Sequence, residues 1–129
     1  MATVLVVEDT PELRTVLEVR LTRSGHRVIS AASGAEALAL LARNGPPDVA
    51  VLDVVMPGMT GFQLRARLRE DPAYASVPVI FLTCRLEPDD VALGRSLGAV
   101  YLTKPVVMTA LTAAIDRVLG PVAAEDGGW

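Results

Sequence analysis

The stretch Val51–Gly61, VLDVVMPGMTG, decides how this 129-residue chain is expected to fold. Its apolar beginning predicts a buried β-strand, and Asp53 follows directly at the point where that strand ends. The Met-Pro-Gly sequence after it predicts a loop, because proline and glycine are strong turn residues. A carboxylate at the tip of a buried strand indicates a functional site if other polar groups meet it there.

Short β-branched runs alternate with longer segments of helical periodicity along the rest of the chain. This alternation predicts an α/β fold in which a parallel sheet is covered on both faces. Five strands are expected, at 3–7, 27–30, 49–52, 77–82 and 99–102. Five helices are expected to begin near Thr10, Ser33, Thr60, Pro88 and Val107, and to end near Gly25, Asn44, Asp71, Leu97 and Leu119.

Two strand orders are open to such a chain. The flavodoxin-like doubly wound order 2-1-3-4-5 places the first and third strands side by side. The dinucleotide-binding order separates them, and its glycine fingerprint is absent because EDTPELR follows the first strand. We therefore expect a flavodoxin-like five-stranded parallel sheet in the order 2-1-3-4-5 with five helices.

Length and composition predict one soluble, cytoplasmic domain. No apolar run approaches the roughly 20 residues that cross a bilayer, and the first residues, MATVLVVEDTPELR, do not resemble a signal peptide. The net charge of −3 and the scattered arginines argue against direct nucleic-acid binding and membrane attachment. Residues 1–120 are expected to form the domain, and 121–129 a C-terminal tail or linker stub.

Polar side chains stand where four of the expected strands end. Glu8 and Asp9 follow the first strand, Asp53 the third, Thr83 the fourth, and Lys104, the only lysine, comes soon after the fifth. In the 2-1-3-4-5 order these groups meet in one crevice at the carboxyl ends of the strands. Three carboxylates crowded together are tolerable beside a hard cation, and Mg²⁺ fits best because it leaves room for phosphate oxygens. The chemistry indicated is phosphoryl transfer to a carboxylate.

The sequence resembles the receiver domain of two-component response regulators, of the chemotaxis-regulator type, from residue 3 to about residue 119. The matching motifs are VVED, VLDVVMPGMTG, VIFLT and GAVYLTKP, in order and at family spacing. The resemblance implies that Asp53 is the phosphoacceptor of a phosphorelay. It also implies Asp9 as a direct ligand of Mg²⁺, or of Mn²⁺ in its place, Glu8 as a water-mediated one, and the backbone carbonyl of Val55 as a further ligand.

The same resemblance assigns the remaining site residues. Thr83 and Lys104 would hold the phosphoryl oxygens, and Thr83 with Tyr101 would form a switch, while Lys104-Pro105 would carry a cis peptide bond. The phosphodonor would be a histidine kinase or a histidine phosphotransfer protein. A downstream partner or a second copy would dock on the face formed by the segments 88–97, 99–102 and 107–119.

Two other functions are open to a chain with these residues. One is a pseudo-receiver, an interaction module that is not phosphorylated; the intact set of five site residues speaks against it. The other is a phosphatase with an aspartyl intermediate, which usually carries a second acid two residues after the nucleophile, where this chain has Val55. The domain is thus expected to be a regulatory phosphoacceptor rather than an enzyme. Val55 and Arg85 also predict slow autodephosphorylation, since neither positions a hydrolytic water.

Overall fold

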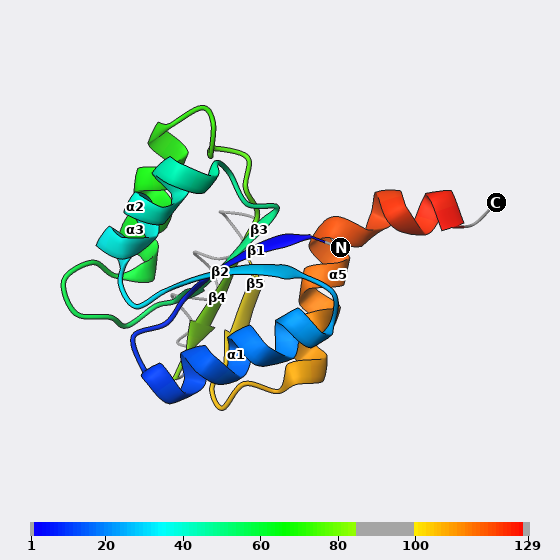
Figure 1. Cartoon of the computed structure of the whole chain (residues 1–129), viewed down its shortest axis with the longest axis horizontal. Coiled ribbons are helices and arrows are strands. Elements are labelled where there is room, and N and C mark those ends of the chain that lie inside the picture. Colours follow the sequence, from blue (N-terminus) through cyan, green and yellow to red (C-terminus); the bar gives the residue numbers. More distant parts are fainter. Residues whose placement is uncertain (1, 85–99, 128–129) are drawn as a thin grey trace.

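A computed structural model describes residues 2–84 and 100–127 of the chain, with side chains up to residue 119. The expected helix at 88–97 lies outside the described residues. Five parallel strands form one sheet in the order β2-β1-β3-β4-β5, as predicted. Their bounds are β1 Thr3–Val7, β2 Arg27–Ala31, β3 Val49–Asp53, β4 Val79–Thr83 and β5 Val100–Thr103 (Figure 1).

Four helices are present in the described part of the chain: α1 Pro11–Arg23, α2 Gly34–Asn44, α3 Gly61–Glu70 and α5 Met108–Gly127. Helices α2 and α3 cover one face of the sheet, and α1 and α5 cover the other (Figure 1). Thr60 and Gln63 begin α3 with a reciprocal capping box, in which each side chain accepts a hydrogen bond from the other residue's backbone N–H. This cap fixes the point at which the loop after Asp53 becomes helix.

Each strand divides its side chains between two apolar clusters, because successive residues point to opposite faces. In β1, Leu5 and Val7 pack toward α2 and α3, whereas Val4 and Val6 pack toward α1 and α5. Strands β3 and β4 are buried along their whole length. The sheet interior thereby provides a rigid base for the residues at its carboxyl edge.

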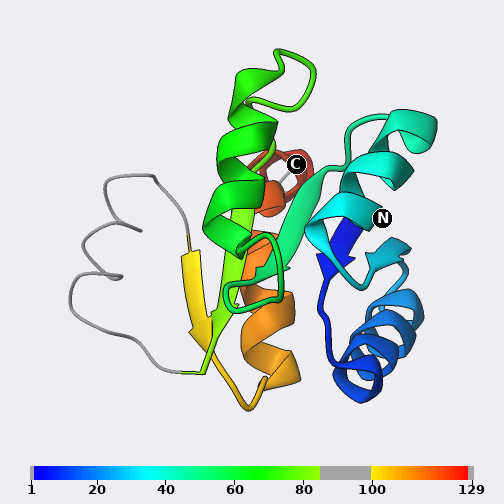
Figure 2. The same cartoon turned by 90° about the vertical axis from the view of Figure 1, so that its left-hand side faces the viewer.

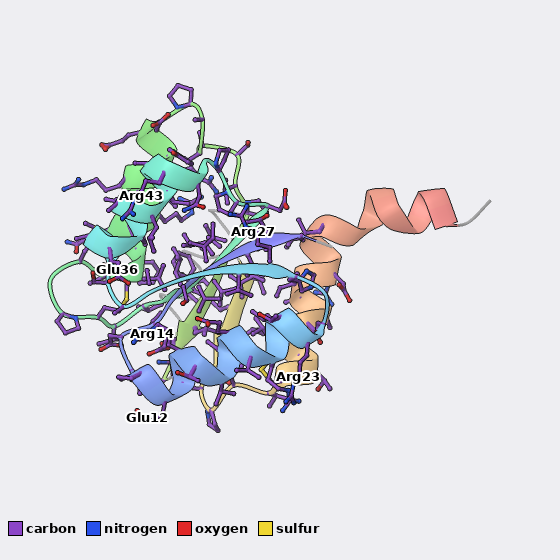
Figure 3. All side chains as sticks on the ribbon, viewed as in Figure 1. Glu12, Arg14, Arg23, Arg27, Glu36 and Arg43 are labelled. Atoms are coloured by element: carbon purple, nitrogen blue, oxygen red, sulfur yellow. The ribbon has the colours of Figure 1, made fainter. Side chains whose placement is uncertain are left out.

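Charged side chains lie on the outside of this arrangement. Figure 3 shows Glu12 and Arg23 on the outer surface of α1, and Glu36 and Arg43 on that of α2. All four are exposed, and charges of both signs are interspersed. Within residues 2–84 and 100–127, no helix combines the length and apolar content that crossing a membrane requires.

Helix α5 is longer than the sequence predicts. It was expected to end at Leu119, before Gly120 and Pro121, but it continues to Gly127. Figure 1 shows it bending and extending away from the sheet. A proline removes only one helical hydrogen bond and bends the helix, while the alanines after Pro121 favour helical backbone. The prediction that 121–129 form a tail or linker stub stays a prediction.

Candidate functional site

The parallel sheet brings the polar residues of four strands to one edge. Asp53 ends β3 and Thr83 ends β4, in strands that are paired with each other, while Glu8 and Asp9 follow β1. Lys104 follows β5, and its backbone N–H donates a hydrogen bond of 2.7 Å to the carbonyl of Thr83. Figure 2 shows the strands running to this common edge. The expected crevice therefore contains all five of these residues.

Three carboxylates form the centre of the site. One oxygen from each of Glu8, Asp9 and Asp53 lies within 4.8 Å of the other two. Glu8 is fully buried and Asp53 is 2% exposed, whereas Asp9 is half-buried. Solvent thus reaches the cluster mainly on the side of Asp9.

The ammonium group of Lys104 compensates two of these charges. Its Nζ lies 2.9 Å from Oε1 of Glu8 and 3.2 Å from Oδ2 of Asp53. Burial opposes the charged form, but the hydrogen bond to Glu8 and the attraction of Asp53 outweigh it and raise the pKa of Lys104. The peptide bond between Lys104 and Pro105 is cis, as predicted. One lysine therefore forms ion pairs with two buried acids.

Glu8 is held more firmly than the other two acids. Its Oε2 accepts a hydrogen bond of 3.0 Å from the backbone N–H of Thr10, and its Oε1 contacts Lys104. Its backbone carbonyl accepts a hydrogen bond of 2.9 Å from Nη1 of Arg14. Because both carboxylate oxygens already have partners, Asp9 and Asp53 are the carboxylates better disposed to meet a cation directly.

The pKa values of Asp53 and Asp9 shift in opposite directions. Burial, the hydrogen bond to Asp9 and the charge of Glu8 together raise the pKa of Asp53 from 3.8 to about 7. For Asp9, burial acts in the upward direction, but its interactions with Asp53 and Glu8 outweigh it and lower its pKa. These shifts favour the protonated form of Asp53 and the charged form of Asp9, and a divalent cation would favour the charged form of both.

The other predicted site residues lie around this cluster. Thr83 is 5% exposed, and Tyr101 is half-buried with its ring 5.2 Å from that of Phe81. The side chain of Val55 is 67% exposed beside the site. The role of the Val55 carbonyl, like the switch pairing of Thr83 with Tyr101, stays a prediction.

Two features of the site were not foreseen from the sequence. The first is Gly61: a Cβ there would lie 2.4 Å from the carbonyl oxygen of Asp53, so α3 begins directly against the end of β3. The second is Phe62, whose ring centroid lies 6.2 Å from that of Tyr101. The glycine of the DxxMPxxxG motif is a signal for the first feature, but no local pattern predicts the second.

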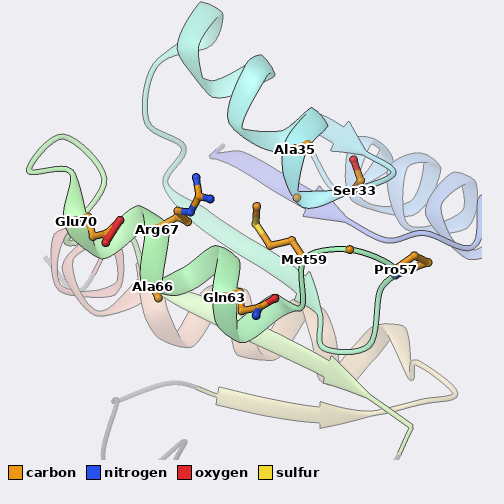
Figure 4. A pocket seen from close by; sticks show the side chains of 10 residues that line it. Ser33, Ala35, Pro57, Met59, Gln63, Ala66, Arg67 and Glu70 are labelled. Carbon is orange, nitrogen blue, oxygen red and sulfur yellow. The ribbon is translucent and has the colours of Figure 1, made fainter.

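A cavity in the described part of the chain lies away from the acids. It measures about 620 Å³ and opens between α2, α3 and the loop before α3 (Figure 4). Met59 projects into it, and Ala35, Ala66 and Arg67 also line it. None of the three carboxylates contributes to it, so the acidic cluster, and not this groove, is the candidate site for chemistry.

Comparison with known proteins decides the family. The family model described as the response regulator receiver domain matches residues 4–116. This chain belongs to that family. The receiver domains of two-component response regulators are regulatory phosphoacceptor domains that bind Mg²⁺ at an acidic pocket and interact with histidine kinases and downstream effectors.

Curated relatives differ in what they add to this domain. AfsQ1, a transcriptional regulatory protein of Streptomyces coelicolor, is 45% identical over 120 residues, which cover 92% of this chain and 52% of AfsQ1. The chain therefore spans about half the length of that relative. Protein PilH of Pseudomonas aeruginosa is 40% identical over 120 residues, covering 92% of this chain and 98% of PilH.

Solved structures show the same fold. The chemotaxis protein CheY4 of Vibrio cholerae is 35% identical, with a TM-score of 0.84, and the match covers 92% of this receiver domain and 98% of CheY4. The response regulator TrrA of Thermotoga maritima, determined in complex with Mg(2+)-BeF, is 27% identical, with a TM-score of 0.76 and coverage of 92% and 99%. The flavodoxin-like prediction is confirmed.

Proposed function

We propose that this receiver domain is a switch activated by phosphorylation of Asp53, with a histidine kinase or histidine phosphotransfer protein as the donor. The observation that carries the proposal is the carboxylate of Asp53, which lies beside the carboxylates of Glu8 and Asp9 and 3.2 Å from the half-buried ammonium of Lys104. Gathering the acids has an electrostatic cost, since burial and the two neighbouring acids raise the pKa of Asp53 to about 7. Binding of a cation and a phosphoryl group at this site would account for the arrangement.

The transfer is an in-line displacement at phosphorus. A carboxylate oxygen of Asp53 forms the new P–O bond, and the P–N bond to the donor imidazole breaks, so that histidine leaves with the electron pair and takes up a proton. Asp53 reacts as its anion, and because its pKa is raised to about 7 the fraction in this form grows as the pH rises through that value. Lys104, already 3.2 Å from Asp53, neutralises charge on the transferred phosphoryl group.

The oxygen ligands that the acidic cluster offers are those that Mg²⁺ prefers. Asp9 and Asp53 would hold it directly, Glu8 through a water molecule, and the carbonyl of Val55 would add a neutral ligand. When bound, the cation supplies charge neutralisation for the phosphoryl oxygens. Mn²⁺ would serve in its place.

The consequence of phosphorylation is proposed to pass through Thr83 and Tyr101. Thr83 ends the strand next to Asp53, so its hydroxyl lies at the edge where a phosphoryl group would stand. Tyr101 lies in register with Phe81, two residues before Thr83 in β4. A downstream partner or a second copy would bind the face that includes β5 and α5 and would respond to the change there. Residues 1–120 would act as the domain, in the cytoplasm. The domain would not contact nucleic acid or membrane directly.

Intact mass spectrometry tests the proposal. The protein is incubated with acetyl phosphate, with and without Mg²⁺, and wild type is compared with Asp53→Asn and with the matched control Asp116→Asn, which removes an exposed carboxylate from α5. One phosphoryl adduct is expected on wild type and on Asp116→Asn, only with Mg²⁺, and none on Asp53→Asn. An adduct on Asp53→Asn would refute the assignment, and no adduct on any protein would favour the pseudo-receiver.

A further inference from the structure

The turn that joins β1 to α1 carries two of the three acids, and its backbone is held at four points. The N–H of Glu8 donates a hydrogen bond of 3.0 Å to the carbonyl of Ala31, which ends β2. The N–H of Thr10 donates one of 3.0 Å to Oε2 of Glu8, and the carbonyl of Thr10 accepts one of 2.9 Å from the N–H of Arg14. The carbonyl of Glu8 accepts one of 2.9 Å from Nη1 of Arg14. Asp9 therefore lies between two residues whose backbone groups are all fixed.

The beginning of α1 lacks the usual side-chain cap. A residue at the N-cap position commonly accepts a hydrogen bond from the first turn of the helix, but the Thr10 side chain accepts none there. Pro11, the first residue of the helix, has no N–H to donate. In place of a cap, the side chain of Arg14 reaches back to the turn that precedes the helix.

The positive charge of Arg14 does not explain its place. Arg14 is half-buried near the beginning of α1, and its guanidinium donates to a neutral carbonyl (Figure 3). The carboxylates of Glu8 and Asp53 already pair with Lys104. A second positive charge beside the acids repels a metal cation. The hydrogen bond, rather than the charge, therefore accounts for Arg14 at this position.

The peptide unit that Arg14 holds is the one that joins Glu8 to Asp9. Its carbonyl belongs to Glu8 and its N–H to Asp9, so the hydrogen bond fixes the backbone from which the Asp9 side chain projects. Glu8 is fully buried and both of its carboxylate oxygens have partners, whereas Asp9 is half-buried. The position of the Asp9 carboxylate, within 4.8 Å of the other two, thus depends strongly on its backbone.

We propose that Arg14 is a positioning residue for cation binding: by holding the carbonyl of Glu8, it keeps the carboxylate of Asp9 directed at the space between the three acids. The inference deepens the proposed function, on which it rests for the identity of the cation. Replacing a residue that orients a metal ligand commonly weakens metal binding by roughly 10- to 100-fold. Loss of the Arg14 hydrogen bond should therefore raise the dissociation constant of the cation about tenfold.

The two effects that removal of Arg14 can have are opposite in sign. If Arg14 acted only through its charge, its removal would reduce repulsion, and the cation would bind more tightly. If Arg14 acts by holding the turn, its removal loosens Asp9, and the cation binds more weakly. The sign of the change in the dissociation constant therefore distinguishes positioning from charge.

Titration with Mn²⁺ measures this constant without any phosphorylation. Free Mn²⁺ is followed by its electron paramagnetic resonance signal at pH 8, after urea denaturation has established that each variant is folded. Arg14→Met has no donor, Arg14→Gln is too short to reach the carbonyl, and Arg14→Lys keeps both a donor and the charge. Arg20→Met is the matched control, since it removes an exposed positive charge farther along the same helix.

Arg14→Met and Arg14→Gln should each raise the Mn²⁺ dissociation constant about tenfold. Arg14→Lys should stay within about twofold of wild type, because an ammonium can donate to the same carbonyl. Arg20→Met should lower the constant or leave it unchanged. An unchanged or lower constant in Arg14→Met and Arg14→Gln would overturn the inference, as would an Arg14→Lys protein that binds as weakly as Arg14→Met.

Phosphorylation by acetyl phosphate provides a second readout. Arg14→Met should need about tenfold more Mg²⁺ for its half-maximal rate and should reach the wild-type rate at saturating Mg²⁺. A rate that stayed low at saturating Mg²⁺ would contradict a role in cation binding, because Arg14 would then act on a later step.

The Mn²⁺ titrations also separate this inference from the proposed function. Asp9→Asn should weaken Mn²⁺ binding at least as much as Arg14→Met, which would locate the ion at the acids. If Arg14→Met binds Mn²⁺ more weakly than wild type but Asp53 takes up no phosphoryl group, the inference stands and the proposed function fails. If wild type is phosphorylated and Arg14→Met binds Mn²⁺ equally well, the inference alone fails. Absence of Mn²⁺ binding in wild type, or binding that Asp9→Asn leaves unchanged, would overturn the inference.

Discussion

Strand β3 contains two regions that are stabilised in opposite ways. From Val49 to Leu52 its side chains are apolar and fully buried, and they pack in the two clusters that join the sheet to its helices. Asp53, the next residue, is equally buried but lies against two other acids. Burial stabilises the first region under all conditions, whereas the energy of the second depends on protons, on cations and on Lys104.

The difference between the two regions shows how a receiver domain can be stable and still respond to Mg²⁺ and to a phosphoryl group. Apolar packing supplies the free energy of folding, and the carboxyl edge of the sheet retains unfavourable charge that Mg²⁺ and a phosphoryl group can relieve. The stability of variants at Leu52 and of variants at Asp53 or its charged neighbours should therefore depend differently on pH and Mg²⁺.

The largest effect is expected in the apolar region. Leu52→Ala should lower the free energy of unfolding by about 4 kcal/mol, because it leaves a cavity in a well-packed core. The loss should be the same at pH 5.5 and pH 8, with or without Mg²⁺, as measured by urea denaturation. A loss that varied with pH or Mg²⁺ would break the distinction between the two regions.

Removal of Lys104 should have the next largest effect. Lys104→Met leaves the buried carboxylate of Glu8 without its cation, at a cost of about 3 kcal/mol at pH 8. The cost should shrink toward pH 5, where Asp53 takes up a proton and the negative charge of the cluster falls. Lys104→Arg is the matched control, since it keeps the charge. Equal losses at both pH values would show that Lys104 acts only through packing.

Asp53→Asn should change stability in the opposite direction. Between pH 3.8 and about 7 the native state keeps the Asp53 proton that the unfolded chain has lost, so wild-type stability falls as the pH rises through this window. Asparagine does not titrate, so this loss of stability is absent from the variant. The free energy of unfolding of the variant should exceed that of metal-free wild type by about 2 kcal/mol at pH 8 and equal it near pH 4. Asp116→Asn should show no such dependence.

Phosphate lifetime should respond to the residues that stand two positions after Asp53 and after Thr83 in the sequence. Val55→Asn combined with Arg85→Glu offers polar groups that can position a hydrolytic water, and should accelerate loss of the phosphoryl group about tenfold, or about 1.4 kcal/mol in the barrier. The decay is followed by intact mass after removal of acetyl phosphate. An unchanged decay would contradict the proposal of slow autodephosphorylation.

Mg²⁺ should give the smallest stability change. At a concentration five times its dissociation constant, the cation should stabilise wild type by about 1 kcal/mol at pH 8. The gain should be smaller at pH 5.5, where the proton on Asp53 competes, and in Asp53→Asn. Thermal unfolding with Mg²⁺, and with Na⁺ at equal ionic strength as control, measures it. Equal gains at both pH values would argue against direct binding at the three carboxylates.

Local patterns in the sequence predicted the strands, their order and the meeting of Glu8, Asp9, Asp53, Thr83 and Lys104, because parallel strands bring their carboxyl ends to one edge. They did not predict that Lys104 pairs with Glu8 as well as Asp53, or that Phe62 packs near Tyr101. Such contacts depend on where along the strands each helix and loop packs against the sheet. The continuation of α5 past Pro121 was missed because a proline bends a helix without always ending it.

The most direct test of the account is to identify the residue that carries the phosphoryl group. After phosphorylation with acetyl phosphate and Mg²⁺, borohydride reduces an aspartyl phosphate to homoserine, and trypsin then releases the segment 44–65, which contains Asp48 and Asp53. Fragment-ion mass spectrometry separates these two positions. Homoserine at position 53 is the predicted result, and homoserine at position 48, or elsewhere with Asp53 intact, would contradict the account.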